Sequence, residues 1–285
     1  MSIAFTRGVR RAAVLCLVVT ATLGSVFVSR AAASTHETMT AHTVHVVATQ
    51  KTTLGGETRG FHSSAPKTIG GDVLAFAPAP STSTSTSDKP LTVVYLHGIH
   101  GKAANGCPHI KNGASDVGWL VCPKADNAEA NGTATWSIDP TKPAAVVTHA
   151  LEAAEAEGAS AEPGVAVGFS QGGYVTLDLV KSGKVKFRGL VLIAAPEAHP
   201  SAEKLHAAGV RRVVLAAGYR DAAYAPLKED AKRLEREGME VRFVSLGDVG
   251  HTYAAEDPTA LHDAIVWAAG SSTQGPAAPA PRSQP

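Results

Sequence analysis

The sequence lacks features that would point to nucleic acid, membranes or nucleotide cofactors. Its 285 residues carry a formal net charge of only +1, so no excess of charge favours binding to nucleic acid or to an anionic membrane. It has no internal repeat, no glycine-rich phosphate loop and no dinucleotide fingerprint. The sequence therefore implies no cofactor.

Cysteine is scarce, with only three in the chain. Cys16 lies in an apolar N-terminal segment, which leaves Cys107 and Cys122 in the remainder. In an oxidising compartment, a disulfide between these two is the expected pairing. A metal site that adds His100 and His109 to the pair is the alternative, but the spacing matches no established zinc pattern.

The N-terminus has the layout of a secretory signal. Three arginines precede a mostly apolar run over residues 12–29, and Ala31-Ala32-Ala33 follows it. A basic region, an apolar region and small residues in this order predict a cleaved signal peptide over 1–33. The alternative is an uncleaved membrane anchor, because the run is nearly long enough to span a bilayer. We expect a secreted, periplasmic or envelope protein with no membrane contact after cleavage.

The rest of the chain divides into three parts. Residues 34–90 contain two short apolar runs, 43–49 and 72–77, and then a low-complexity Ser/Thr stretch. We interpret them as N-terminal strands and a solvated loop of the same domain as the region that follows. Residues 91–270 form the main folded region. The tail 271–285 is rich in proline, and we expect it to be disordered.

Apolar runs and helical stretches alternate through the main region. The expected strands are 91–96, 118–122, 164–168, 189–194, 211–218 and 240–246. The clearest expected helices are 143–158, 226–238 and 257–270. Runs that are apolar on both faces suit strands covered by helices on both sides. The alternation predicts an α/β fold with a mostly parallel, doubly wound sheet flanked by helices.

One short segment carries the strongest chemical signal. Gly168-Phe169-Ser170-Gln171-Gly172 stands between an expected strand and an expected helix. In a nucleophile elbow, glycines flank a serine that the turn lifts above the carboxyl edge of the sheet. The alternative is a tight turn with a capping serine. The strand–turn–helix context favours Ser170 as a nucleophile.

A serine nucleophile needs a base and an acid to activate it. In such folds they follow the serine in the order acid, then histidine, each just after a strand. Asp221 follows the expected strand 211–218, and His251 follows 240–246. Asp248 is a rival for the acid because it lies three residues before His251. We assign Ser170, Asp221 and His251 as the triad.

The segment Leu96-His97-Gly98-Ile99-His100-Gly101 follows the first buried strand. This is where such a fold places one backbone N–H of an oxyanion hole, and the N–H of Gln171 would supply the other. A simple β-turn is the alternative reading of His97-Gly98. The twin glycines favour the oxyanion interpretation, and we expect His97 itself to be structural.

Together, "LHGIHG", "GFSQGG", "GYRD" and "GHTY" resemble the α/β-hydrolase superfamily. The nearest pattern is the phospholipase/carboxylesterase branch, which includes acyl-protein thioesterases and borders the dienelactone hydrolases. The resemblance covers about residues 91–270 and implies that Ile99 and Gln171 are the oxyanion donors. It also implies that Trp136, in "TWSID", contacts substrate.

Only a short connection separates the strands 189–194 and 211–218, so we expect no large cap domain. The segment 101–135 then becomes the expected wall of the pocket. The resemblance implies a serine esterase acting on small-molecule or polymeric carboxylic esters. A serine peptidase, a polyester depolymerase or feruloyl esterase, and a catalytically silent envelope binding protein remain the alternatives.

Overall fold

A computed structural model describes residues 64–80, 89–196 and 198–270, all within one compact unit, Thr58–Pro285. The expected signal peptide (1–33), the expected strand 43–49, most of the Ser/Thr-rich stretch and the tail 271–285 lie outside the described residues.

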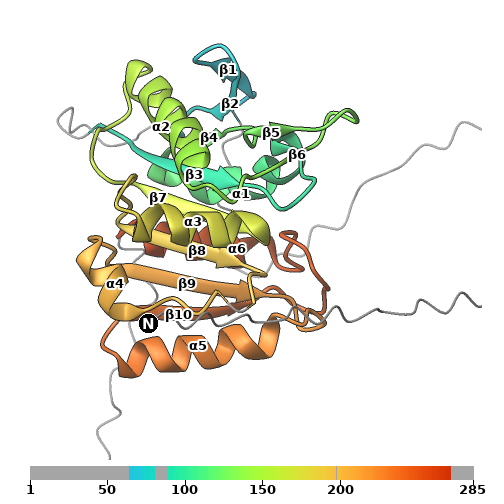
Figure 1. Cartoon of the computed structure of the whole chain (residues 1–285), viewed down its shortest axis with the longest axis vertical. Helices are drawn as coiled ribbons and strands as arrows, with labels where there is room; N and C mark the ends of the chain where they lie inside the picture. The colour runs from blue at the N-terminus through green and yellow to red at the C-terminus, as the bar shows by residue number, and fades with distance from the viewer. Residues whose placement is uncertain (1–63, 81–88, 197, 271–285) are drawn as a thin grey trace, which may run out of the picture. The chain divides into compact units, whose positions relative to one another are not determined.

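The described residues form an eight-stranded sheet in the order β1-β2-β4-β3-β7-β8-β9-β10 (Figure 1). The strands are β1 (Lys67–Ile69), β2 (Val73–Phe76), β3 (Leu91–Leu96), β4 (Gly118–Cys122), β7 (Val165–Phe169), β8 (Gly189–Ile193), β9 (Arg212–Ala217) and β10 (Glu240–Ser245). From β4 to β10 neighbouring strands run parallel, whereas β1 and β2 at one edge are antiparallel to their neighbours. A separate small hairpin joins β5 (Asn127–Ala128) to β6 (Ala134–Thr135).

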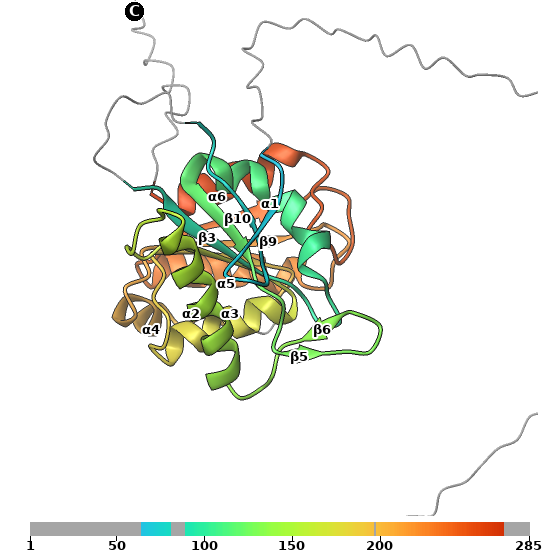
Figure 2. The same ribbon diagram turned by 90° about the horizontal axis from the view of Figure 1, so that it is seen from above.

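Helices cover both faces of the sheet. They are α1 (Ala103–Val117), α2 (Thr141–Ala156), α3 (Gln171–Lys181), α4 (Ala202–Ala207), α5 (Tyr224–Arg236) and α6 (Pro258–Ala268). Buried side chains of α1 and α6 pack on one face, and those of α2, α3, α4 and α5 pack on the other. Figure 2 shows α1 and α6 across the sheet from α2 and α3. The predicted doubly wound sheet is therefore confirmed.

The central strands are buried throughout because their side chains are apolar on both faces. All five residues of β7 and of β8 are buried, as expected from their unbroken apolar runs. The expectation was wrong for β10, which forms the far edge of the sheet and is largely half-buried or exposed. Glu240 and Arg242 alternate with apolar residues along it, which suits an edge strand with one wet face.

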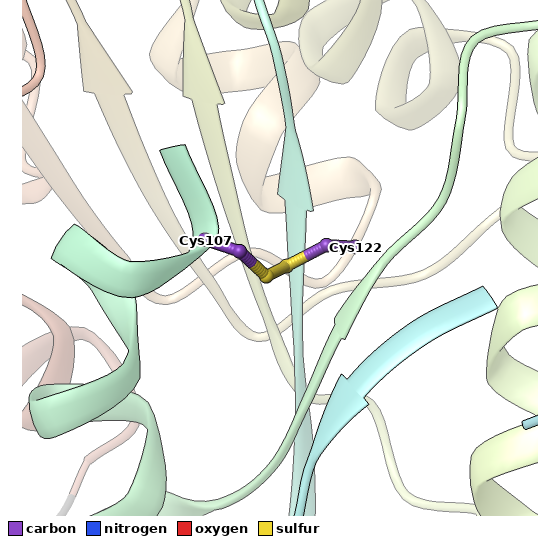
Figure 3. The surroundings of a disulfide bond; sticks show 2 residues. All are labelled: Cys107 and Cys122. Carbon is purple, nitrogen blue, oxygen red and sulfur yellow. A yellow bond between two sulfur atoms is a disulfide. The ribbon is translucent and has the colours of Figure 1, made fainter. Parts of the chain in front are cut away.

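Cys107 of α1 and Cys122 at the end of β4 form a disulfide (Figure 3). Their Cα atoms lie 6.3 Å apart, within the usual range for such bonds. Both residues are buried. The bond therefore fixes α1 against the sheet next to the turn that follows β3.

In the described residues of the connection between β8 and β9, the short helix α4 is the only helix or strand. As expected, no cap domain is inserted there. Across the described ranges, every helix is either too short or too polar to cross a bilayer.

Candidate active site

Ser170 stands alone between the end of β7 and the start of α3. Its backbone has φ 51° and ψ −118°, a strained conformation for a residue with a Cβ. The turn is held by hydrogen bonds from Ser170 N–H to Ile193 O (2.8 Å) and from Gly173 N–H to Ser170 O (2.9 Å). The elbow therefore projects the Ser170 hydroxyl above the carboxyl edge of the sheet.

The glycines on either side of Ser170 are needed because strand and helix backbones approach closely. A Cβ at Gly168 would lie 2.5 Å from the carbonyl oxygen of Gly172. A Cβ at Gly172 would lie 2.1 Å from the carbonyl oxygen of Leu96 in β3. No side chain fits at either distance, which answers why the sequence places glycine at both positions.

The structure brings the three predicted triad residues together. Nε2 of His251 lies 3.0 Å from Oγ of Ser170, and Nδ1 of His251 lies 2.9 Å from Oδ2 of Asp221. A carboxylate only accepts, so Nδ1 carries the proton and Nε2 is free to accept from the serine hydroxyl. This is the arrangement in which a histidine can take the proton of a serine nucleophile.

Two loops hold the acid and the base in register. Tyr219 N–H donates to Gly247 O, and Arg220 N–H donates to Val249 O, so the loop after β9 is bonded to the loop after β10. The side chain of Asp221 is 3% exposed, and its Oδ1 accepts the N–H of Ala223. Both carboxylate oxygens of Asp221 are thereby fixed.

Asp248, the rival acid, has a different partner. Its carboxylate pairs with Arg220 (Nε–Oδ1 3.1 Å), and its carbonyl oxygen accepts two further hydrogen bonds from the same guanidinium. Asp248 therefore helps to join the two loops rather than orienting His251.

Aromatic rings surround the base. The ring of His251 lies 5.1 Å from that of Phe169, which meets Tyr253 edge-on at 4.9 Å. His109 packs against the other side of Tyr253 at 5.2 Å, and burial raises the pKa of the Tyr253 hydroxyl.

In the described part of the chain no three His, Cys, Asp or Glu side chains gather to hold a metal.

The predicted oxyanion donors lie at two facing segments. Gln171 is the first residue of α3, so its N–H has no partner within the helix and is influenced by the positive end of the helix dipole. Ile99 lies in the turn after β3 and is 54% exposed. A Cβ added at Gly98 would contact the side chains of Phe169 and Ser170. The turn after β3 therefore lies against the nucleophile elbow.

His97 anchors the start of this turn from inside. Its Nδ1 lies 2.8 Å from Gly98 O, and its Nε2 accepts the N–H of Ala125 over 3.2 Å. Burial lowers the pKa of His97, an effect partly offset by the bond to Gly98. Accepting at Nε2 requires the neutral ring with the proton on Nδ1.

The structure corrects the role expected of Trp136. The residue is 2% exposed, so its side chain is packed inside the protein and does not line an open surface. Its Nε1–H donates to His97 O, and its backbone N–H and C=O are both bonded to the side-chain amide of Gln171. Trp136 thus joins the two segments that carry the predicted oxyanion donors.

The segment 101–135 was expected to form a wall of the pocket. Most of it is instead α1 and β4, which belong to the core layers. His109 of α1 packs against Tyr253 near the base, and the β5–β6 hairpin reaches the turn after β3, where Gly101 and Ala134 form an antiparallel bridge. Its contacts include Glu129, which the sequence did not single out because it lies far along the chain from its partner His100.

No protein-family model and no curated protein matches the sequence, but solved structures do. An uncharacterized protein from Bacillus cereus is 18% identical with a TM-score of 0.56, covering 68% of this chain and 64% of that one. The S-formylglutathione hydrolase FrmB of Staphylococcus aureus is 18% identical (TM-score 0.51; 69% and 92% covered). FphF, a fluorophosphonate-binding serine hydrolase of Staphylococcus aureus, is also 18% identical (TM-score 0.50; 69% and 91% covered).

These likenesses define the class: the chain has the α/β-hydrolase fold. Within that class its structural neighbours include serine hydrolases, in agreement with the resemblance read from the sequence motifs.

Proposed function

We propose that this protein is an exported serine esterase that cleaves carboxylic esters through an acyl-enzyme intermediate. The observation that carries the proposal is the continuous hydrogen-bonded chain from Ser170 through His251 to Asp221, with distances of 3.0 and 2.9 Å. Ser170 lies on a nucleophile elbow at the carboxyl edge of an α/β-hydrolase sheet. The three hydrogen-bonded side chains therefore have both the chemistry and the location expected of a catalytic triad.

In the proposed mechanism, His251 Nε2 takes the proton of Ser170 while Oγ attacks the ester carbonyl. The negative charge that develops on the carbonyl oxygen is stabilised by the backbone N–H groups of Ile99 and Gln171. His251 then returns the proton to the leaving alcohol, and the acyl-enzyme forms. A water molecule, activated by the same histidine, releases the acid, and Asp221 stabilises the imidazolium in both steps.

The form of the catalytic edge supports bulky esters as substrates. The exposed large apolar side chains among the described residues are Ile99, Ile138, Tyr174 and Tyr219. Ile99 and Tyr219 follow the carboxyl ends of β3 and β9, and Tyr174 stands in the first turn of α3, which begins after β7, so these three lie at the edge that carries Ser170. With no cap after β8, this edge favours long-chain or polymeric esters as a second candidate substrate class.

Export is supported by the signal-like N-terminus and by the buried disulfide. A disulfide of this kind persists in oxidising compartments and is rare in the cytosol. We therefore propose that the enzyme works outside the cytoplasm, where intracellular acyl-protein substrates are absent.

The deciding experiment measures hydrolysis of p-nitrophenyl esters of graded acyl length, with a peptide amide in parallel and the Ser170→Ala variant as control. Ester turnover that depends on Ser170 supports the proposal. Faster turnover of the amide would indicate a peptidase. A folded protein that turns over neither substrate and resists fluorophosphonate would indicate a silent binding protein.

A further inference from the structure

The turn that carries Ile99 contains a residue in an unfavourable backbone conformation. Gly101 N–H donates to Gly98 O over 3.1 Å and closes the turn, and His100, its third residue, has φ 51°. Glycine or asparagine normally fills this position. A histidine there is strained and keeps its conformation only where surrounding contacts hold it. The direction of the neighbouring Ile99 N–H therefore depends on groups outside the turn.

The β5–β6 hairpin supplies those groups. Nδ1 of His100 lies 2.6 Å from Oε1 of Glu129, and the backbone N–H of His100 donates to Oγ1 of Thr135 over 3.3 Å. Thr135 Oγ1 in turn donates to the same Glu129 oxygen over 2.6 Å. Backbone and side chain of His100 are thus both bonded to one small cluster, which consists of Glu129, Thr133 and Thr135.

Glu129 is the centre of this cluster. Its second oxygen, Oε2, accepts from Thr133 Oγ1, so both carboxylate oxygens have donors. These hydrogen bonds, from Thr133 first and then Thr135 and His100, lower the pKa of Glu129 to about 2. The side chain is only 24% exposed. The carboxylate therefore stays ionised and oriented at any pH at which a serine hydrolase works.

The hairpin does not need Glu129 in order to stay in place. Gly101 and Ala134 exchange two backbone hydrogen bonds, of 3.1 and 3.0 Å, and the buried Trp136 is bonded to His97 and Gln171. Glu129 adds a hydrogen bond to the side chain of His100, the residue directly after Ile99. Glu129 therefore stabilises the turn rather than the position of the hairpin.

We propose that Glu129 is a positioning residue of the oxyanion hole. Through His100 and Thr135 it holds the turn Gly98–Gly101 in the conformation that presents the N–H of Ile99 to the developing oxyanion. This inference rests on the proposed esterase function.

The test compares Glu129→Ala with Glu157→Ala. Glu157 is a matched control because it forms an ion pair of the same length, 2.6 Å to Lys67, at the C-terminal end of α2, away from the carboxyl edge of the sheet. Full loss of an oxyanion donor costs about 10²–10³ in kcat, and a misplaced donor costs less. We expect kcat of Glu129→Ala to fall about tenfold or more with KM little changed, and Glu157→Ala to retain wild-type kcat.

Two further measurements separate positioning from loss of structure. Affinity for a trifluoromethyl ketone, which forms a tetrahedral adduct, should fall in Glu129→Ala by about the same factor as kcat. Glu129→Gln keeps an oxygen for His100 but cannot accept from Thr133 with its amide nitrogen, so it should restore part of the lost kcat. A kcat of Glu129→Ala equal to that of Glu157→Ala, or a loss confined to KM, would overturn the proposal. If Glu129→Ala does not fold, Thr135→Val carries the same test.

Hydrogen exchange at the His100 amide, which donates to Thr135 Oγ1 in the Glu129 cluster, tests the positioning without relying on turnover. Faster exchange in Glu129→Ala than in Glu157→Ala supports the inference, and equal rates contradict it. If the wild type neither hydrolyses esters nor reacts with fluorophosphonate, the proposed function fails, while this exchange measurement still decides whether Glu129 holds the turn.

Discussion

Asp221 Oδ2 lies 2.9 Å from His251 Nδ1, although Asp248 is far closer to His251 along the chain. Asp221 follows β9, a fully hydrogen-bonded strand inside the sheet, and its side chain is almost completely buried. Asp248 lies on the same loop as His251 with its side chain 72% exposed. A rigid, buried element orients a catalytic group better than an exposed loop does.

The first prediction compares Asp221→Asn with Asp248→Asn. Asn at 221 presents an amide to His251 Nδ1 and disturbs the tautomer, as in serine proteases, where the equivalent change lowers kcat about 10⁴-fold. We expect a loss of this order for Asp221→Asn. Asp248→Asn removes only an exposed ion pair with Arg220 and should change kcat by less than about tenfold. Steady-state kinetics on one ester substrate decide between them, and a larger loss at 248 would show that the acid is wrongly assigned.

The second prediction concerns Ser170 and the strain of its backbone. Ser170→Ala should abolish turnover and fluorophosphonate labelling, because only this hydroxyl can form the acyl-enzyme. Its melting temperature should stay close to that of the wild type, because alanine keeps the same strained φ of 51°.

Ser170→Gly separates the two effects. Glycine adopts positive φ without a steric cost, so this equally inactive variant should be more stable than Ser170→Ala by about 1 kcal/mol. For a domain of this size that corresponds to a rise of about 2–4 °C in melting temperature. Differential scanning calorimetry of the two variants measures it, and a glycine variant that melts below the alanine variant would argue against strain at the elbow.

The third prediction concerns the disulfide between Cys107 and Cys122. The bond spans a sequence separation of 15, for which the chain-entropy model gives about 3 kcal/mol of stabilisation. Replacing both cysteines by alanine should lower the melting temperature by roughly 6–12 °C, with activity retained at low temperature. Reducing agent should lower the melting temperature of the wild type similarly and leave the variant unchanged. Two free thiols in the non-reduced exported protein would contradict the prediction.

The central sheet could be predicted well from the sequence, because buried parallel strands have continuous apolar sequences. Strands β3 and β4 coincide with the unbroken apolar runs 91–96 and 118–122. That Ser170, Asp221 and His251 lie together was also predictable, because the elbow motif, the chain order and the positions after strands each constrain one residue.

Helix α1 could not be predicted, because its sequence opposes a helix locally. Gly106, Pro108 and Gly113 all lie within it, and each has low helix propensity. The tertiary fold explains the glycines: a Cβ at Gly106 would lie 2.0 Å from the hydroxyl oxygen of Tyr95, and one at Gly113 would lie 2.8 Å from Cα of His262. Close packing on the sheet and on α6 selects residues that local propensity would reject.

The contacts that support the turn Gly98–Gly101 could not be predicted from the sequence either. Glu129 and His100 are 29 residues apart, and no motif links them. Trp136 stands in a segment that suggested substrate contact, but a tryptophan does not reveal from sequence whether its indole N–H meets a ligand or a buried carbonyl. Only the fold brings it to His97 O.

The last prediction is a pH dependence that originates at His97. Burial holds the pKa of the folded-state imidazole below its ordinary value of 6.5, because the charged form is poorly solvated there. Below that ordinary value the unfolded chain binds a proton that the folded chain does not bind, so the free energy of unfolding falls as pH falls. Above it, both states are neutral and His97 contributes no pH dependence.

The comparison of His97→Gln with the wild type isolates this effect from the other histidines. Between about pH 7.5 and about pH 5.5, the wild type should lose more stability than His97→Gln, measured as the free energy of unfolding in urea. His206→Gln, the same substitution at an exposed position on α4, serves as the control for replacing a histidine by glutamine. Equal slopes for wild type and His97→Gln would mean that His97 can protonate in the folded protein. That result would conflict with its acceptor bond from Ala125 and with the neutral ring that is bonded to Gly98 at the start of the turn Gly98–Gly101.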